Sequence, residues 1–503
     1  MFRDALPLTQ LDPREAWSAW EPTAEQPWNR KWAGHLFRRA AFGCPPRRGQ
    51  ESAAETLDRA VRQGLESCFE QLFAEPAKDD KFESLMDDLA PTTDPRNGGF
   101  NITVGSAPHR SLQAWWMHRL WHSPFHLRER LTLFWHSHFA TSLAKVRQVG
   151  LLLQQNRLFR ERGAGRFGEL LLAVSRDPAM VLWLDSASNL KEHPNENYAR
   201  ELLELFTLGV GHFNESDIRE TARAFTGWGL NRSVNASFES NAEVAFQFHG
   251  EQHDFGAKTV FGQSGKWDGG DIVRIVLQQP AAAQRIATKL YRAFVSENEA
   301  PPPELLEPLA RQLRETEYEI KPVLRTILRS RLFFSRQAYR QRIKSPVEFA
   351  LNLAHAIGHN ANPAMLAQVA AELGQELFAP PNVKGWDGGK AWLNSATLLG
   401  RHNLAWAWLS GEPAPGPATD ANGQPLAVMK LDVRRVVSTA AALPQSEQLD
   451  FWLTALLDGE LAPASRDKLA EWFAGHAARG SSPQRATVDL AHTIAALPEY
   501  QLA

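Results

Sequence analysis

The chain has 503 residues, of which 43% are hydrophobic and 22% charged, and its formal net charge is -2. Such values are ordinary for a globular protein of two or more domains, and they lack the basic excess that an electrostatic nucleic-acid binder needs. The two cysteines, Cys44 and Cys68, leave open a single bridge but exclude a disulfide framework and a thiolate metal cage. Because the basic excess is absent, we expect no nucleic-acid partner.

No signal for membrane insertion or export is visible. The sequence has no run of about eighteen apolar residues, so we expect no membrane-spanning segment. The first residues, MFRDALPLTQLDPREAW, lack the apolar centre of a secretory signal peptide. These observations indicate a cytoplasmic protein, and export together with a signal-bearing partner would leave the same sequence.

Residues 1–230 begin with a proline-punctuated stretch and continue as helices. Residues 1–30 predict an extended N-terminal arm. The segments 32–43 and 52–73 have apolar positions at helical spacing, and glycine and prolines close the first of them. Residues 31–230 are therefore predicted to form an N-terminal helical domain.

The stretch from residue 185 to 229 concentrates charged and amide side chains. Pro194 interrupts the helix there, and Asn195 is placed to cap the next one, with Glu196 in its first turn. Three- or four-residue spacing then puts one set of polar side chains on a single helix face. This set is Asn197, Arg200, Glu201 and Glu204.

A second helix, from about residue 215 to 225, presents Glu220 and Arg223. Because only a short turn joins the two helices, they are predicted to lie antiparallel as a helix hairpin. Three hypotheses follow. The charges form a structural Arg–Glu network that sets helix register, or two glutamates and a histidine bind a metal ion, or paired carboxylates perform acid–base catalysis on a polar substrate.

Residues 231–265 alternate apolar and polar side chains between glycines, which predicts a β-hairpin insertion. His253, Asp254 and Lys258 lie in it. The His–Asp pair is the best candidate for completing a metal or acid–base site. The structural alternative is that Asp254 caps a turn and His253 is exposed.

The remaining chain reads as helix again. Residues 266–411 form a second helical region, 412–425 a linker, and 426–503 a C-terminal helical cap. Within the second region, the Pro/Gly loop 380–389 presents Trp386, either as a stacking surface beside the site or as a plug in the helical core. The predicted fold is mainly α, a multi-helix orthogonal or bundle-like array with one small β-hairpin insertion.

Six blocks in this order resemble the large bacterial family called domain of unknown function 1800. They are HLFRRAAFG, LRERLTLFWHSHFATS, NENYARELLELFTLGVGHFNESDIRETARAFTGW, HDFGAKTVFG, KSPVEFALNLAHAIG and PPNVKGWDGGKAWLNSATLLGRHNLA, spread over most of residues 32–410. The resemblance implies a mainly helical protein with no established activity. It also implies a sulfatase-like partner that often carries an export signal.

The best functional hypothesis is a hydrolase, metal-assisted or carboxylate-based, that acts on a polar, glycan-like substrate. The alternative is a non-catalytic helical scaffold or chaperone-like partner of the sulfatase-like protein. For the hydrolase, the candidate catalytic residues are Glu196, Glu201, Glu204 and Asp254. The candidate substrate-binding residues are Asn195, Asn197, Arg200, Arg223, Lys258 and Trp386. A divalent metal ion would be bound by His253, Glu201 and Glu204.

Overall fold

The computed structural model describes residues 7–44, 51–77, 80–90, 108–231, 244–357, 361–412, 433–477 and 482–503. Within these ranges helices dominate, and the sheets are two antiparallel pairs of short strands. The predicted mainly α-helical class is therefore confirmed. Across the same ranges, no helix combines the length and apolar character that crossing a membrane requires.

Several helices of the first half begin at caps that their own sequences supply. Ser52 and Glu55 form a reciprocal cap at the start of α3, and Asn214 and Asp217 do the same for α12. These helices are α1 (Pro13–Trp17), α2 (Arg30–Ala40), α3 (Ala53–Leu72), α4 (Lys81–Asp88), α5 (Pro108–His122), α6 (His126–His138), α7 (Leu143–Val146), α8 (Val149–Arg162), α9 (Phe167–Ser175), α10 (Pro178–Trp183), α11 (Asn197–Glu201) and α12 (Glu215–Ala224).

The β element begins earlier than predicted and consists of two strand pairs. β1 (Trp228–Leu230) pairs with β2 (Phe246–Phe248), and β3 (Lys258–Val260) pairs with β4 (Gln263–Gly265). The single hairpin predicted over 231–265 is thus corrected, because the first strand still belongs to the end of the central stretch. Residues 232–243, which connect β1 to β2, lie outside the described residues.

The second half returns to helix, and Ser345 caps α17 as the helix start at Pro346 requires. The Ser345 hydroxyl accepts from the Glu348 backbone N–H at 3.3 Å. These helices are α13 (Gly269–Leu277), α14 (Pro280–Phe294), α15 (Pro303–Glu315), α16 (Ile320–Arg329), α17 (Pro346–Ile357), α18 (Pro363–Glu372), α19 (Ser395–Ser410), α20 (Arg434–Ala441), α21 (Gln445–Leu457), α22 (Pro463–Ala477) and α23 (Pro483–Ala496), followed by the 3-10 turn η7 (Pro498–Gln501).

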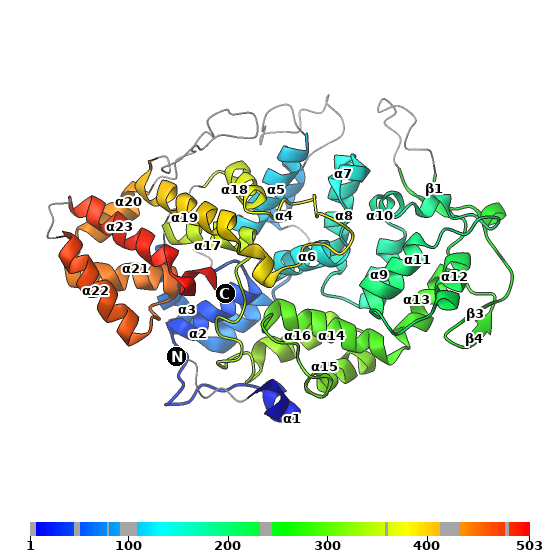
Figure 1. The fold of residues 1–503 in the computed structure, drawn as a ribbon, viewed down its shortest axis with the longest axis horizontal. Coiled ribbons are helices and arrows are strands. Elements are labelled where there is room, and N and C mark those ends of the chain that lie inside the picture. The colour runs from blue at the N-terminus through cyan, green and yellow to red at the C-terminus, as the bar shows by residue number, and fades with distance from the viewer. Residues whose placement is uncertain are drawn as a thin grey trace.

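Two hydrophobic cores hold these helices together. One joins α2 and α3 to α9 and to α13–α16, and the other joins α5 to α17, α18 and the C-terminal helices. In Figure 1, α19–α23 lie at one end of the molecule, and α11–α13 with the strands lie at the other. Each core combines early and late segments, so the division into contiguous domains remains a prediction. The predicted linker, 412–425, falls outside the described residues except for Glu412.

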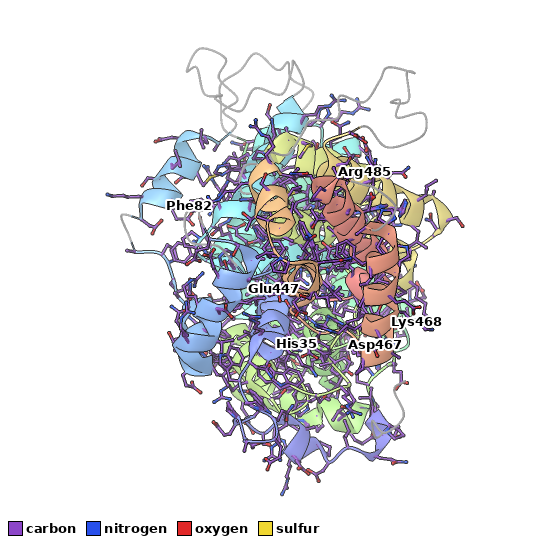
Figure 2. All side chains as sticks on the ribbon, turned by 90° about the vertical axis from the view of Figure 1, so that its left-hand side faces the viewer. His35, Phe82, Glu447, Asp467, Lys468 and Arg485 are labelled. Carbon is purple, nitrogen blue, oxygen red and sulfur yellow. The ribbon has the colours of Figure 1, made fainter. Side chains whose placement is uncertain are left out.

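The C-terminal end of the molecule presents a polar outer face. Seen from that end, Asp467 and Lys468 lie on α22 and Arg485 lies on α23, and all three side chains are exposed (Figure 2). The inner faces of both helices are apolar and contribute Leu469 and Leu490 to the second core. This is the amphipathic pattern that the sequence shows for the segment.

Candidate functional site

The central stretch folds as α11, a π-helical turn η4 (Leu202–Thr207) and α12. The Asn195 side chain accepts from the Asn197 N–H at 2.9 Å, so the helix begins beside Asn195. In the π turn, the Leu208 N–H reaches back five residues to the Leu203 carbonyl at 2.9 Å. Such π turns are rare and often occur at functional sites.

Asn195 and Asn197 use their amides to hold the preceding turn. Asn195 Nδ2 donates to the Ser188 hydroxyl at 2.9 Å, and Asn197 Nδ2 donates to the Leu184 carbonyl at 3.1 Å. Both residues therefore have clear structural roles. Their predicted contacts with substrate hydroxyls stay a prediction.

Glu196 and Arg200 belong to a surface ion cluster. Arg200 Nη2 lies 2.9 Å from Glu215 Oε2 and 3.4 Å from Glu196 Oε2. The side chains of Glu196, Arg200 and Glu215 are 37%, 39% and 71% exposed. Solvent-exposed pairs of this kind contribute little to stability. Glu196 is thus paired with Arg200 at the surface of the helix.

Arg223 joins α12 to the β element. Its Nε lies 2.7 Å from Asp254 Oδ2, and its Nη1 lies 2.7 Å from Glu220 Oε2. The hydrogen bond from Arg223 holds the pKa of Asp254 below its usual value. Lys258 Nζ donates to the Asp254 carbonyl at 2.5 Å. These four residues form a structural staple between a helix and a loop, which is one part of the predicted Arg–Glu network.

His253 is buried rather than exposed. Its Nδ1 lies 2.8 Å from the Thr226 carbonyl oxygen, and its ring packs between Phe248 and Phe255 with centroid distances of 5.3 and 4.7 Å. In the described part of the chain, no three His, Cys, Asp or Glu side chains are grouped so that they could hold a metal ion. His253, Glu201 and Glu204 thus do not converge as predicted, because His253 is held in the β element by Thr226.

Glu201 and Glu204 differ from the other predicted carboxylates. Both are partly buried, and neither side chain forms an ion pair or hydrogen bond with any residue that the structure describes. Burial raises the pKa of Glu201, and the charge of Glu204 raises it further, while Arg200 and Lys384 act in the opposite direction. The two carboxylates therefore influence each other electrostatically beside the π turn.

Helix α14 supplies cations to the same region. Arg285 Nη2 lies 3.5 Å from the Glu204 carbonyl oxygen. Lys289 forms no hydrogen bond or ion pair with a described residue, and burial together with Arg285 and Arg292 lowers its pKa to about 8. The prediction missed these residues. Arg285, Lys289 and Arg292 follow one another at intervals of four and three residues, which places all three cations on one helix face. This spacing was the sequence signal that could have identified them.

The loop 380–389 packs against the end of α6 and carries Lys384 toward Glu201. Gly385 has a φ of +81°, and a Cβ there would collide with the Ser137 carbonyl. The partly exposed ring of Trp386 lies 5.6 Å from the His136 ring. Lys384 of this loop acts electrostatically on Glu201, and the role of the loop as a stacking surface beside the site stays a prediction.

Five of the predicted site residues fall into two groups. Glu201 is near Lys384 and Glu204 is near Arg285, Lys289 lies one turn further along α14, and we call these five residues the glutamate cluster. Arg223, Asp254 and Lys258 belong to the staple with Glu220. No hydrogen bond, ion pair or ring contact joins the two groups within the described ranges, and a single site formed by both stays a prediction.

Two buried ion networks lie elsewhere and were missed. Glu129 Oε1 lies 2.7 Å from Arg160 Nε and 3.0 Å from Arg119 Nε. Glu348 is shared in the same way by Arg130 and Arg342. All of these side chains are at most 8% exposed. Arg119 and Arg342 are 10 and 6 residues from their carboxylates. Arg160 and Arg130 come from more distant segments, so the sequence pattern did not indicate that the buried networks would form.

Asp177 lies at an open pocket of about 580 Å³ that Arg157, Arg162 and Arg176 also line. Burial raises the pKa of Asp177 to about 7. Its Oδ2 accepts from Gln155 Nε2 at 2.7 Å and from the Met180 N–H at 3.0 Å. These bonds make the Asp177 side chain the cap of α10, which explains its buried position without a catalytic role.

A comparison with family models finds one match, described as "Protein of unknown function (DUF1800)", over residues 35–502. No curated protein and no solved structure matches the chain.

Proposed function

Because the chain belongs to the DUF1800 family, whose description assigns no activity, we propose a function from the glutamate cluster: acid–base hydrolysis of a polar, glycan-like substrate. One observation carries the proposal. Among the predicted catalytic carboxylates, Glu196 and Asp254 are engaged by arginines, whereas Glu201 and Glu204 are partly buried without a partner among the described residues. Unpaired, desolvated carboxylates are the groups that acid–base chemistry requires.

Glu201 has the properties of the general acid. Burial and the neighbouring Glu204 raise its pKa, which favours the protonated form that donates to a leaving-group oxygen. Glu204 is then the carboxylate that activates water or attacks the substrate. This division of roles between two carboxylates is the general pattern of glycoside hydrolysis.

The surrounding side chains would bind the substrate. Lys384, Arg285 and Lys289 can donate to hydroxyl or anionic groups, and Trp386 supplies a partly exposed ring of the kind that stacks on sugars. A metal-assisted route would need a ligand besides Glu201 and Glu204, and His253 is committed elsewhere. The carboxylate route therefore makes fuller use of the residues present.

The test is hydrolysis by the full chain against a panel of nitrophenyl glycosides and polysaccharides, measured as released nitrophenol and reducing ends. Glu201→Gln and Glu204→Gln are expected to lower kcat at least about 100-fold, since each removes an acid–base group. Glu196→Gln, on the same helix but paired at the surface, is the matched control and should retain activity. Turnover that survives both substitutions, or a wild-type protein inactive on every substrate, contradicts the proposal.

A second candidate function, a scaffold for a sulfatase-like partner, is favoured by exposed apolar side chains at the strand end. Phe248 and Phe255 are 45% and 62% exposed, and they flank the His253 ring from both sides. Co-expression with that partner, followed by purification, would show a stoichiometric complex that Phe255→Ser weakens. Residence in the cytoplasm, or export with the partner, stays a prediction that fractionation of the same cells would test.

A further inference from the structure

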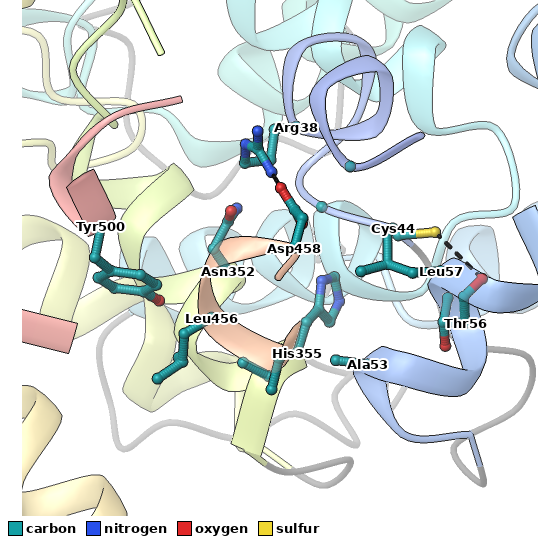
Figure 3. A pocket seen from close by; sticks show the side chains of 14 residues that line it. Arg38, Cys44, Ala53, Thr56, Leu57, Asn352, His355, Leu456, Asp458 and Tyr500 are labelled. Atoms are coloured by element: carbon teal, nitrogen blue, oxygen red, sulfur yellow. Dashed lines mark hydrogen bonds and ion pairs between the residues drawn. The ribbon is translucent and has the colours of Figure 1, made fainter. Parts of the chain in front are cut away.

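A cavity of about 50 Å³ lies where α2, α3 and α17 meet the end of α21 and the turn η7. Its polar lining includes Arg38, Asn352, Asp458 and Tyr500, which come from separate parts of the chain, with Tyr500 on the far side of the lining from the Arg38–Asp458 pair (Figure 3). Neither glutamate of the glutamate cluster lines it. The cavity is thus a second polar site that the sequence did not indicate.

An ion pair between Arg38 and Asp458 is built into the cavity wall. Arg38 Nη1 contacts Asp458 Oδ2, and the two side chains are only 8% and 13% exposed. Asp458 follows α21 with a left-handed φ of +56°, and Gly34 on α2 leaves room for its carboxylate, because a Cβ at Gly34 would collide with it. The Tyr339 ring centroid lies 5.8 Å from Arg38 Cζ. The guanidinium is therefore held in one orientation.

Buried donors at this cavity have no protein partner. Arg38 Nε and Nη2 and the Tyr500 hydroxyl form no hydrogen bond with any residue the structure describes. The Tyr500 side chain is 1% exposed, and its hydroxyl is turned toward the other lining side chains (Figure 3). Buried donors are rarely left unsatisfied, since each would lose its bonds to water without replacement. A group that accepts hydrogen bonds is therefore expected beside these donors.

The surroundings of the cavity carry an excess of positive charge. Lys344 Nζ lies 3.7 Å from the centroid of the Tyr500 ring. Burial lowers the pKa of Lys344, and three neighbouring arginines, Arg38, Arg340 and Arg401, lower it further. The nearby carboxylate of Glu348 is already shared by two other arginines, and Asp458 balances Arg38 alone. The lowered pKa favours the neutral amine of Lys344, so Arg340 and Arg401 supply the net positive field that an anion in the cavity would meet.

We propose that this cavity binds a small oxyanion, either a carboxylate or a phosphate or sulfate ion, through Arg38 and the Tyr500 hydroxyl. Nε and Nη2 on one edge of a guanidinium are spaced to bind two oxygens of such a group at once. A water molecule needs about 10–15 Å³ of such space, so a cavity of about 50 Å³ admits a group of only a few heavy atoms. The site does not depend on the proposed hydrolysis.

The experiment is isothermal titration calorimetry of the full chain with phosphate, sulfate and acetate, each at constant ionic strength maintained with chloride. Wild-type protein should bind one of these anions at one site per chain. Tyr500→Phe removes the donor but keeps the ring against which Lys344 packs, and it should weaken binding at least about tenfold. Arg466→Gln, which removes a surface arginine paired with Asp450, should leave binding unchanged.

Which anion binds distinguishes a carboxylate ligand from a phosphate or sulfate ligand. Arg38→Lys keeps the positive charge but removes the paired Nε and Nη2 donors of the guanidinium, and it is expected to abolish saturable binding. Circular dichroism verifies the fold of each variant, and if Arg38→Lys does not fold, Tyr500→Phe decides alone. Absence of binding to wild type at millimolar anion, or equal affinity in Tyr500→Phe, overturns the proposal and leaves a water-filled cavity.

Discussion

Arg223 donates from Nε to Asp254 Oδ2 at 2.7 Å, and this bond ties α12 to the loop that precedes β3. The two residues are 31 positions apart, and the Arg223 guanidinium also holds Glu220. Arg223 and Glu220 therefore tie α12 to the β element, whereas Arg200 and Glu215 join the two helices of the hairpin.

Asp254→Asn should lower the free energy of unfolding by about 1 kcal/mol. The substitution removes the negative charge that accepts the Arg223 hydrogen bond, and the Asp254 side chain is only 21% exposed. Chemical denaturation measures the change. The control is Asp450→Asn, which breaks the ion pair of Asp450 with Arg466, and the Asp450 side chain is 57% exposed. It should lower the free energy of unfolding by no more than about 0.5 kcal/mol. Equal losses in the two variants would mean that the staple has no special role.

Glu348→Gln should be far more damaging, with a loss of about 3–5 kcal/mol. The substitution leaves the buried cations Arg130 and Arg342 without their shared carboxylate. Urea unfolding monitored by circular dichroism provides the measurement. Glu471→Gln, at an exposed position of α22, should be close to neutral. A wild-type-like midpoint for Glu348→Gln would show that neighbouring carbonyls or solvent satisfy the two arginines.

Glu129 should make stability depend on acid pH. Burial by itself raises its pKa, but Arg160 and Arg119 outweigh this and lower the value to about 2, from an ordinary 4.5. Since the folded pKa is depressed, the stabilisation is complete above about pH 4.5 and is lost as the pH falls toward 2. Between about pH 6 and 3, the free energy of unfolding should therefore decrease more steeply for the wild type than for Glu129→Gln. Parallel curves would contradict this assignment.

Lys289 should react with amine reagents at unusually low pH. Burial, Arg285 and Arg292 lower its pKa to about 8, so a substantial neutral fraction exists near that pH. Labelling by a small reagent such as cyanate, followed by mass spectrometry, should reach its half-maximal rate near pH 8. The exposed Lys468 is the internal control for access of the reagent. Profiles of the same shape would show that Lys289 is an ordinary surface lysine.

The helical fold was readable from the sequence because its signals are local. Apolar spacing predicted the segments that became α2 and α3, and Pro346 marked the first residue of α17. The family resemblance is confirmed over residues 35–502. The β element was predicted over residues 231–265, but its first strand begins at Trp228, which pairs with Phe248. The prediction was therefore correct only in part, because Trp228 had been assigned to the preceding helical domain.

The site was readable to a lesser degree. Glu201 and Glu204 were chosen for their shared helix face, and the structure places them together with Lys384 from a loop far along the chain. Asn195 was chosen as a helix cap, and its side chain does accept from the first turn. His253 was assigned to a metal, but its ring is directed to the Thr226 carbonyl in the same β element.

By itself, the sequence determined the helical class, the family and individual helix starts such as that of α17 at Pro346, because periodicity, caps and prolines act over a few neighbouring residues. Only the tertiary structure decided which charges are paired. Arg130 meets Glu348 and Arg38 meets Asp458 across hundreds of residues, while Glu201 and Glu204 have no hydrogen-bond or ion-pair partner among the residues that the structure describes. The strength of a charge–charge interaction depends on distance and burial, and both are set by how the helices pack rather than by their order in the chain.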